Sequence, residues 1–103
     1  MDEMLRSALL QSLADDNWVV RAHTTAAMLS LPMDYELINA ISENLNDTHW
    51  PVRLIAMYSL AKHQGSNFRK VLAHTAEYDS DKLVREMAVA LGGTAPKTAE
   101  PAK

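Results

Sequence analysis

Acidic and basic side chains that could carry out chemistry recur at a fixed spacing along the chain. Valine precedes arginine at residues 20–21, 52–53 and 84–85, so successive copies are 32 residues apart, and an aspartate stands six residues before each arginine. The set is Asp15, Arg21, Asp47, Arg53, Asp79 and Arg85. Paired charges of this kind can shift a carboxylate pKa for acid–base work, but structural ion-pair networks shift pKa values as well. We therefore favour a structural role for all six.

Other residue types that serve in active sites are not arranged for a reaction. The four histidines, at positions 23, 49, 63 and 74, lack the i, i+4 spacing with which two helical histidines hold one metal ion. The chain has no cysteine, no glycine-rich phosphate loop and no Gly-x-Ser-x-Gly turn. We expect no enzymatic activity, no metal and no cofactor.

The composition indicates one soluble all-α domain. The chain has 103 residues, of which 48% are hydrophobic and only 6% aromatic, with three glycines and four prolines. Its formal net charge of -3 offers no basic surface for a phosphate backbone, so nucleic acid is not an expected partner. The acidic start and the absence of an apolar run of about 20 residues argue against a signal peptide and a membrane partner. We expect a cytoplasmic protein.

Helical periodicity lies between the repeated landmarks. Apolar residues recur at i, i+4, i+8 over 5–13 and over 37–45, and Asp34 and Ser66 are placed to begin helices. Gly65 is placed to end one. Asp16, Thr48 and Ser80, directly after the repeated aspartates, are the predicted N-caps of three more. The predicted helices are 3–14, 17–31, 35–46, 49–63, 67–78 and 81–92, and residues 93–103 are predicted to be a disordered tail.

An aspartate six residues before a Val-Arg pair, with a small residue three positions after the arginine, resembles the HEAT repeat signature. Tetratricopeptide repeats have a similar length of about 34 residues, but their Trp-Leu-Gly-Tyr pattern is absent. The short period is similar to that of bilin lyase subunits and of many small bacterial adaptors. The resemblance implies three tandem helical hairpins, at about 1–32, 33–64 and 65–92, forming a short right-handed α-solenoid. It also implies that the repeated aspartates and arginines form a ladder of hydrogen bonds between neighbouring hairpins.

Apolar residues on the second helices form a candidate partner-binding strip. Helical steps of about 100° place them opposite the stripe that begins with Val20 and Thr24. The strip consists of Trp18, Leu29, Trp50, Leu54, Met57 and Tyr58. The resemblance places second helices on the concave side, where an exposed apolar strip would bind a partner. A broad core, or a cover provided by self-association, is the alternative for this strip, and inter-repeat packing is the alternative for Trp18 and Trp50.

Three functions are compatible with this pattern. The leading one is a non-catalytic protein-binding adaptor or an accessory subunit of a larger complex, whose partner is an unidentified protein. The second is an accessory factor for chromophore or cofactor attachment, which the resemblance to bilin lyase subunits implies. The third is a nucleic-acid function similar to that of HEAT-like DNA glycosylases. The second helices carry few free cations and include the acidic Glu86, which argues against this function.

Overall fold

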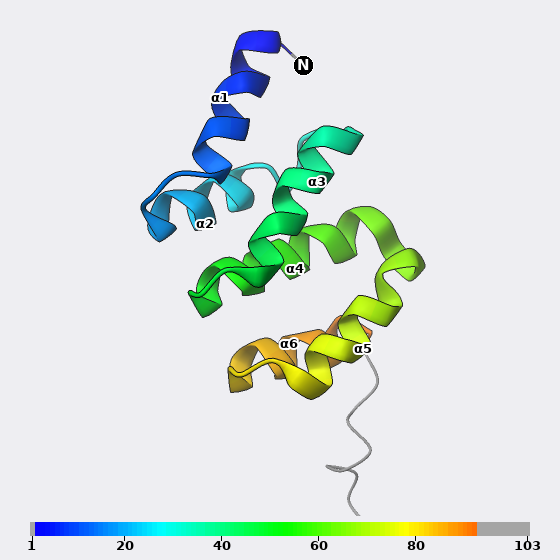
Figure 1. Ribbon diagram of the computed structural model, residues 1–103. Helices are drawn as coiled ribbons and strands as arrows, with labels where there is room; N and C mark the ends of the chain where they lie inside the picture. The colour runs from blue at the N-terminus through cyan, green and yellow to red at the C-terminus, as the bar shows by residue number, and fades with distance from the viewer. Residues whose placement is uncertain (1, 93–103) are drawn as a thin grey trace, which may run out of the picture.

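Helices account for all regular secondary structure in the computed structural model, which describes residues 2–92 (Figure 1). The α-helices are α1 (Glu3–Leu13), α2 (Trp18–Ala27), α3 (Tyr35–Glu43), α4 (Trp50–Gln64), α5 (Arg69–Tyr78) and α6 (Lys82–Ala90). Two short 3-10 helices are η1 (Asn44–Asn46) and η2 (Gly65–Phe68). The prediction of an all-α chain is confirmed for these residues. The predicted tail at 93–103 lies outside them.

Consecutive helices pack in pairs, α1 with α2, α3 with α4, and α5 with α6. Figure 1 shows the pairs following one another from the blue N-terminal end to the orange C-terminal end. The second helices also touch one another, since α4 packs against both α2 and α6. One apolar core runs through the pairs and includes Leu13, Met28, Ile41, Leu60, Leu72 and Val84, all less than 4% exposed. The middle helix α4 therefore contacts the pairs on both sides.

The three second helices begin one residue later than predicted. Their N-cap residues are Asn17, His49 and Asp81, not Asp16, Thr48 and Ser80. The reason is that each repeated aspartate accepts a hydrogen bond from the backbone N–H two residues on, which holds the chain in a turn before the helix. The N···Oδ1 distances are 2.8, 2.9 and 2.9 Å for residues 17, 49 and 81.

The first helices differ from prediction at three ends, of which the end of α1 differs by a single residue. Asp34 caps α3 as expected, accepting a hydrogen bond from the backbone N–H of Leu37 at 2.9 Å. Ser66 does not cap α5, because η2 continues to the buried Phe68 before α5 begins. The last turn of the predicted helix 35–46 tightens into η1. Gly65 ends α4 with a φ of 56°, a conformation that glycine adopts without steric cost.

Each arginine of the repeat bonds the loop of its own repeat, and the first two also bond the loop of the next repeat. Its Nη1 donates to the carbonyl oxygen of the aspartate in its own repeat, at 2.6 Å for Arg21, 2.8 Å for Arg53 and 2.7 Å for Arg85. In the first two copies, Nε and Nη2 also donate to the carboxylate of the following repeat. The two carboxylates belong to Asp47, at 2.7 and 3.1 Å from Arg21, and Asp79, at 3.0 and 2.9 Å from Arg53. The bonds therefore connect repeat one to two and two to three.

A further arginine forms a comparable tie that the 32-residue period does not include. Arg6 on α1 donates from Nε to Asp34 at 2.8 Å and from Nη2 to Glu36, at the start of α3. These hydrogen bonds raise the pKa of Arg6 above its ordinary value. Hydrogen bonding from Arg6 is also the main reason why the pKa of Asp34 lies below its ordinary value. The first helices of repeats one and two are thus joined by charge as well.

The carboxylates of the two inter-repeat bonds are nearly buried, with side-chain exposures of 7% for Asp47 and 11% for Asp79. Burial by itself raises the pKa of each carboxyl group. Hydrogen bonds from the arginine of the preceding repeat and from the backbone N–H two residues on outweigh burial, so both pKa values lie below the ordinary value. The charged forms of Asp47 and Asp79 are therefore the native ones at neutral pH.

Arg53→Ala should destabilise the fold more than Arg85→Ala. Removing Arg53 leaves the nearly buried Asp79 carboxylate without its partner, a loss of about 3 kcal/mol for a charge pair of this kind. Removing Arg85 deletes one described hydrogen bond, to the Asp79 carbonyl, a loss of about 1 kcal/mol. Urea unfolding measures both, and equal losses would contradict this account of the ladder.

Lowering the pH should unfold the chain through these aspartates. Because their folded-state pKa values are depressed, their contribution is complete above the unfolded pKa of about 3.9 and is lost as pH falls through the lower folded values. Asp79→Asn should lower stability at pH 7 and flatten its dependence between about pH 5 and pH 3. Urea midpoints across this range measure the slope, and Asp16→Asn, an exposed neighbour of the first copy, is the control. A slope unchanged by Asp79→Asn would contradict the role of this carboxylate.

Candidate functional site

An apolar recess of about 480 Å³ opens between α4 and α6. Its lining consists of Trp50, Leu54, Leu83, Glu86, Met87 and Ala90. Trp50 is 40% exposed and Leu83 is 54% exposed, although both side chains are large and apolar. Glu86 is the one charged residue of the lining, and its carboxylate lies 3.2 Å from the Lys82 ammonium group. The recess can therefore bind an apolar group, with a single carboxylate at its side.

Helical spacing brings these side chains to the recess. Trp50 and Leu54 are four residues apart on α4, and Leu83, Met87 and Ala90 follow an i, i+4, i+7 stripe on α6, so each set occupies one helix face. The buried Val84 and Ala88 lie on a different face of α6, and α6 packs closely against α5. The stripe on α6 is therefore turned toward α4 and the solvent between the two helices.

The predicted strip is only partly exposed in the structure. Met57 is 1% exposed and belongs to the core, so its prediction as a surface residue is wrong. Helical steps of about 100° place Met57 about 60° from Leu54, in the direction of the buried Leu60. Tyr58 is 37% exposed, while Leu54 is half-buried at the recess.

Trp18 and Leu29 lie apart from the recess lining. Trp18, at the start of α2, stacks its indole on the imidazole of His49, with ring centroids 5.1 Å apart and planes inclined by 13°. His49 stands before α4, so the stack joins the second helices of repeats one and two. Leu29 follows the end of α2 and is half-buried. The structure thus gives Trp18 the packing contact that was the alternative for both tryptophans, whereas Trp50 lines an open recess.

Two large apolar recess residues on α6, Leu83 and Met87, were missed by the sequence analysis, whereas Ala90 lies on the predicted face, 32 residues after Tyr58, but was not included in the strip. Adding 32 to the residue numbers of the strip selects the same face on each second helix. A recess between two helices, however, is also lined by residues on the side of the next helix that is turned toward the first. The i, i+4, i+7 spacing of these residues is the signal that could have identified them. Residues on both sides of each second helix must therefore be considered when a recess is predicted from the repeat.

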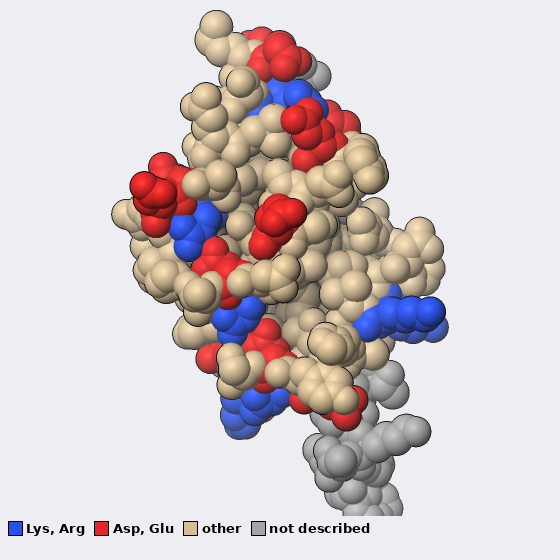
Figure 2. All heavy atoms as spheres, in the orientation of Figure 1, with Lys and Arg blue, Asp and Glu red and all other residues tan. Residues whose placement is uncertain are grey.

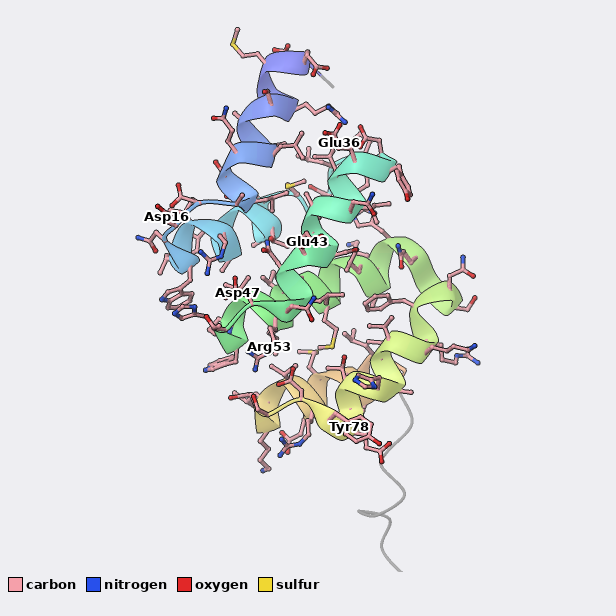
Figure 3. All side chains as sticks on the ribbon, viewed as in Figure 1. Asp16, Glu36, Glu43, Asp47, Arg53 and Tyr78 are labelled. Atoms are coloured by element: carbon pink, nitrogen blue, oxygen red, sulfur yellow. The ribbon has the colours of Figure 1, made fainter. Side chains whose placement is uncertain are left out.

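Two further recesses, of about 410 and 500 Å³, lie where the ladder crosses the loops. Figure 3 labels Asp47 and Arg53 there, close to the helix ends that the ladder joins. Both recesses are lined by an aspartate and an arginine of the repeat, and these groups already bond one another or loop carbonyls. The side chains of Arg21, Asp47, Arg53 and Asp79 at these recesses are therefore already used in holding the repeats together.

Charges of both signs are mixed over the described surface. Figure 2 shows acidic and basic side chains alternating along one edge, with larger uncharged areas beside them. Within residues 2–92, no group of three or more histidines or carboxylates could hold a metal ion. No helix of this described part is long and apolar enough to cross a bilayer.

The family model for HEAT repeats matches residues 6–92. No curated protein and no solved structure matches the chain. The matched range contains all three copies of the aspartate and Val-Arg signature and nearly all of the described helices. The chain therefore belongs to the HEAT repeat family.

Proposed function

We propose that this chain is a non-catalytic adaptor or accessory subunit that binds another protein through the second-helix face. In this proposal the helix pairs are three HEAT-like hairpins stacked as a short right-handed α-solenoid, with α2, α4 and α6 on the concave side. HEAT repeats commonly serve as scaffolds for protein interactions. In this fold, part of the surface formed by the second helices is apolar. The recess between α4 and α6 is the observation that carries the proposal.

Exposure of large apolar side chains supports a binding role for this face. Leaving Trp50 and Leu83 at 40% and 54% exposure forgoes the stabilisation that burial would give, on the order of 25 cal/mol for each Å². Contiguous apolar surface on a soluble chain commonly marks an interface. Tryptophan and tyrosine are enriched among residues that dominate binding energy, and Tyr58 adds a tyrosine on α4 beyond the recess.

The dimensions and chemistry of the recess define the kind of partner contact. A volume of about 480 Å³ admits a few apolar side chains and is small for a whole helix. The partner surface would place leucine, methionine or phenylalanine side chains between Trp50 and Leu83. A basic partner residue could reach Glu86, whose side chain is 57% exposed. Attachment of a chromophore or another cofactor rests on the family resemblance alone, and stays a prediction.

The double substitution Trp50→Ala with Tyr58→Ala should weaken partner binding far more than it weakens the fold. Each side chain is more than a third exposed, so its loss should cost less stability than the 3–5 kcal/mol of a core aromatic. At the centre of an interface each truncation commonly costs about 2 kcal/mol, or roughly 30-fold in affinity. A photo-crosslinking side chain at position 83 identifies the partner, and titration calorimetry then measures its affinity.

The matched control is Leu5→Ala with Tyr35→Ala, two exposed apolar residues on α1 and α3 that lie outside the recess. This pair should leave partner affinity within about twofold of the parent chain. If the Trp50 and Tyr58 variant unfolds early in urea while its folded fraction binds the partner normally, the residues serve packing and the proposed interface is wrong.

A further inference from the structure

Arg85, the last arginine of the ladder, makes the same hydrogen bond within its own repeat as Arg21 and Arg53. It differs from them in the Nε and Nη2 atoms, which in the other two bind a carboxylate of the following repeat. Its Nη1 donates to the Asp79 carbonyl oxygen at 2.7 Å, as Arg21 and Arg53 donate within their own repeats. In those two copies, the Nε and Nη2 edge holds a carboxylate 26 residues further along. Within residues 2–92, Arg85 has no hydrogen bond to a carboxylate on this edge. The guanidinium is thus oriented by its own loop for a carboxylate that the described residues do not supply.

The first aspartate of the ladder presents the complementary half. Asp15 accepts the backbone N–H of Asn17 at 2.8 Å, which is the turn that Asp47 and Asp79 also make. Those two aspartates also accept from an arginine of the preceding repeat. Asp15 has no such bond among the described residues. The carboxylate therefore has the backbone setting of a ladder aspartate but lacks the arginine.

Neighbouring residues strengthen the complementarity. Ser80, directly after Asp79, lies with its hydroxyl 3.4 Å from the Nη2 of Arg53, so this position also approaches the preceding arginine. The first copy carries Asp16 at the same place, which adds a second carboxylate. At the other end, Lys82 adds a cation one helical turn before Arg85 and is 79% exposed. Figure 3 labels Asp16 at the start of α2, in the pair at the opposite end of the molecule from α6.

We infer that a second copy of this chain continues the ladder head to tail, with Arg85 of one copy binding Asp15 of the next. The contact uses different surfaces on the two copies, so it does not close into a symmetric dimer unless a ring forms. The contact joins copies in one direction, in the same way as the ladder joins successive repeats within one chain. The proposal concerns the two ends of the ladder and is independent of the apolar recess.

The contact is polar and weak. One repeat earlier, Trp50 and Leu54 occupy the positions that Lys82 and Glu86 hold on α6, and these two charged residues pair with each other at 3.2 Å. These two positions of the last repeat therefore bring charge and no apolar area to the contact. Ion pairs that remain accessible to water are screened by salt within about 10 Å at 0.1 M ionic strength. Association should accordingly appear only at high concentration, on the order of 0.1–1 mM, and at low salt.

Sedimentation velocity of the full chain between about 20 µM and 1 mM in 20 mM salt tests the inference. The parent chain should show a weight-average sedimentation coefficient that rises with concentration past the dimer value, and 0.5 M salt should abolish the rise. Asp15→Arg alone and Arg85→Asp alone should each reduce the association constant at least about fivefold. The two changes combined in one chain should restore association, because the pair is then reversed and not removed.

Milder variants and controls separate this pairing from other causes. Asp15→Asn and Arg85→Gln remove charge with little change of shape, and both should also reduce association while circular dichroism stays helical. Arg69→Asp and Glu77→Arg, exposed charge reversals on α5, should leave association unchanged. A parent chain that stays monomeric up to 1 mM at low salt would overturn the inference. Association that survives the single reversals, or a combined variant that does not recover, would overturn it as well.

Discussion

A guanidinium group that bonds its own loop and the next loop is the interaction on which the arrangement of the repeats depends. Arg53 holds the Asp47 carbonyl with Nη1 and the Asp79 carboxylate with Nε and Nη2, while its side chain is only 13% exposed. The planar fork of arginine can make these bonds simultaneously, whereas a lysine ammonium group cannot match both in fixed directions. Each arginine–aspartate pair between repeats therefore fixes the distance and the orientation between two consecutive loops.

The arginine–aspartate pair between two repeats determines where the second helices lie. Each ladder aspartate uses one oxygen for the backbone N–H two residues on, which sets the first turn of α4 or α6 while the arginine holds the same carboxylate. Because loops and helix starts are fixed together, α4 packs against both α2 and α6. The apolar residues between α4 and α6 then line an open recess, in which Trp50 stays 40% exposed. The same repeated hydrogen bonds thus hold the repeats together and position the helices that line the recess.

The sequence predicted the helical repeat well because its signals are local and periodic. Apolar spacing, the Asp34 cap and the Gly65 stop are each determined within a few residues of chain. The predicted N-caps at Asp16, Thr48 and Ser80 were wrong by one residue, because the preceding aspartate uses its side chain to make a turn. That choice depends on a hydrogen bond that sequence type alone does not specify.

The candidate site was less predictable because exposure depends on how neighbouring helices cross. Met57 and Leu54 lie only about 60° apart around α4, yet Met57 is buried beside the core and Leu54 lines the recess. Trp18 and Trp50 are equivalent in the repeat, but one stacks on His49 and the other stays 40% exposed. Arg6 was missed as a tie between first helices because its partners, Asp34 and Glu36, lie outside the repeated signature.

A double-mutant cycle between Arg53 and Asp79 measures the inter-repeat bond directly. Urea unfolding of Arg53→Gln, Asp79→Asn and the double variant gives the coupling free energy once the single losses are subtracted. We expect a coupling of about 2 kcal/mol for the pair, against less than about 0.5 kcal/mol for the exposed Lys82 and Glu86. A coupling for Arg53 and Asp79 no larger than that of the exposed pair would contradict this expectation.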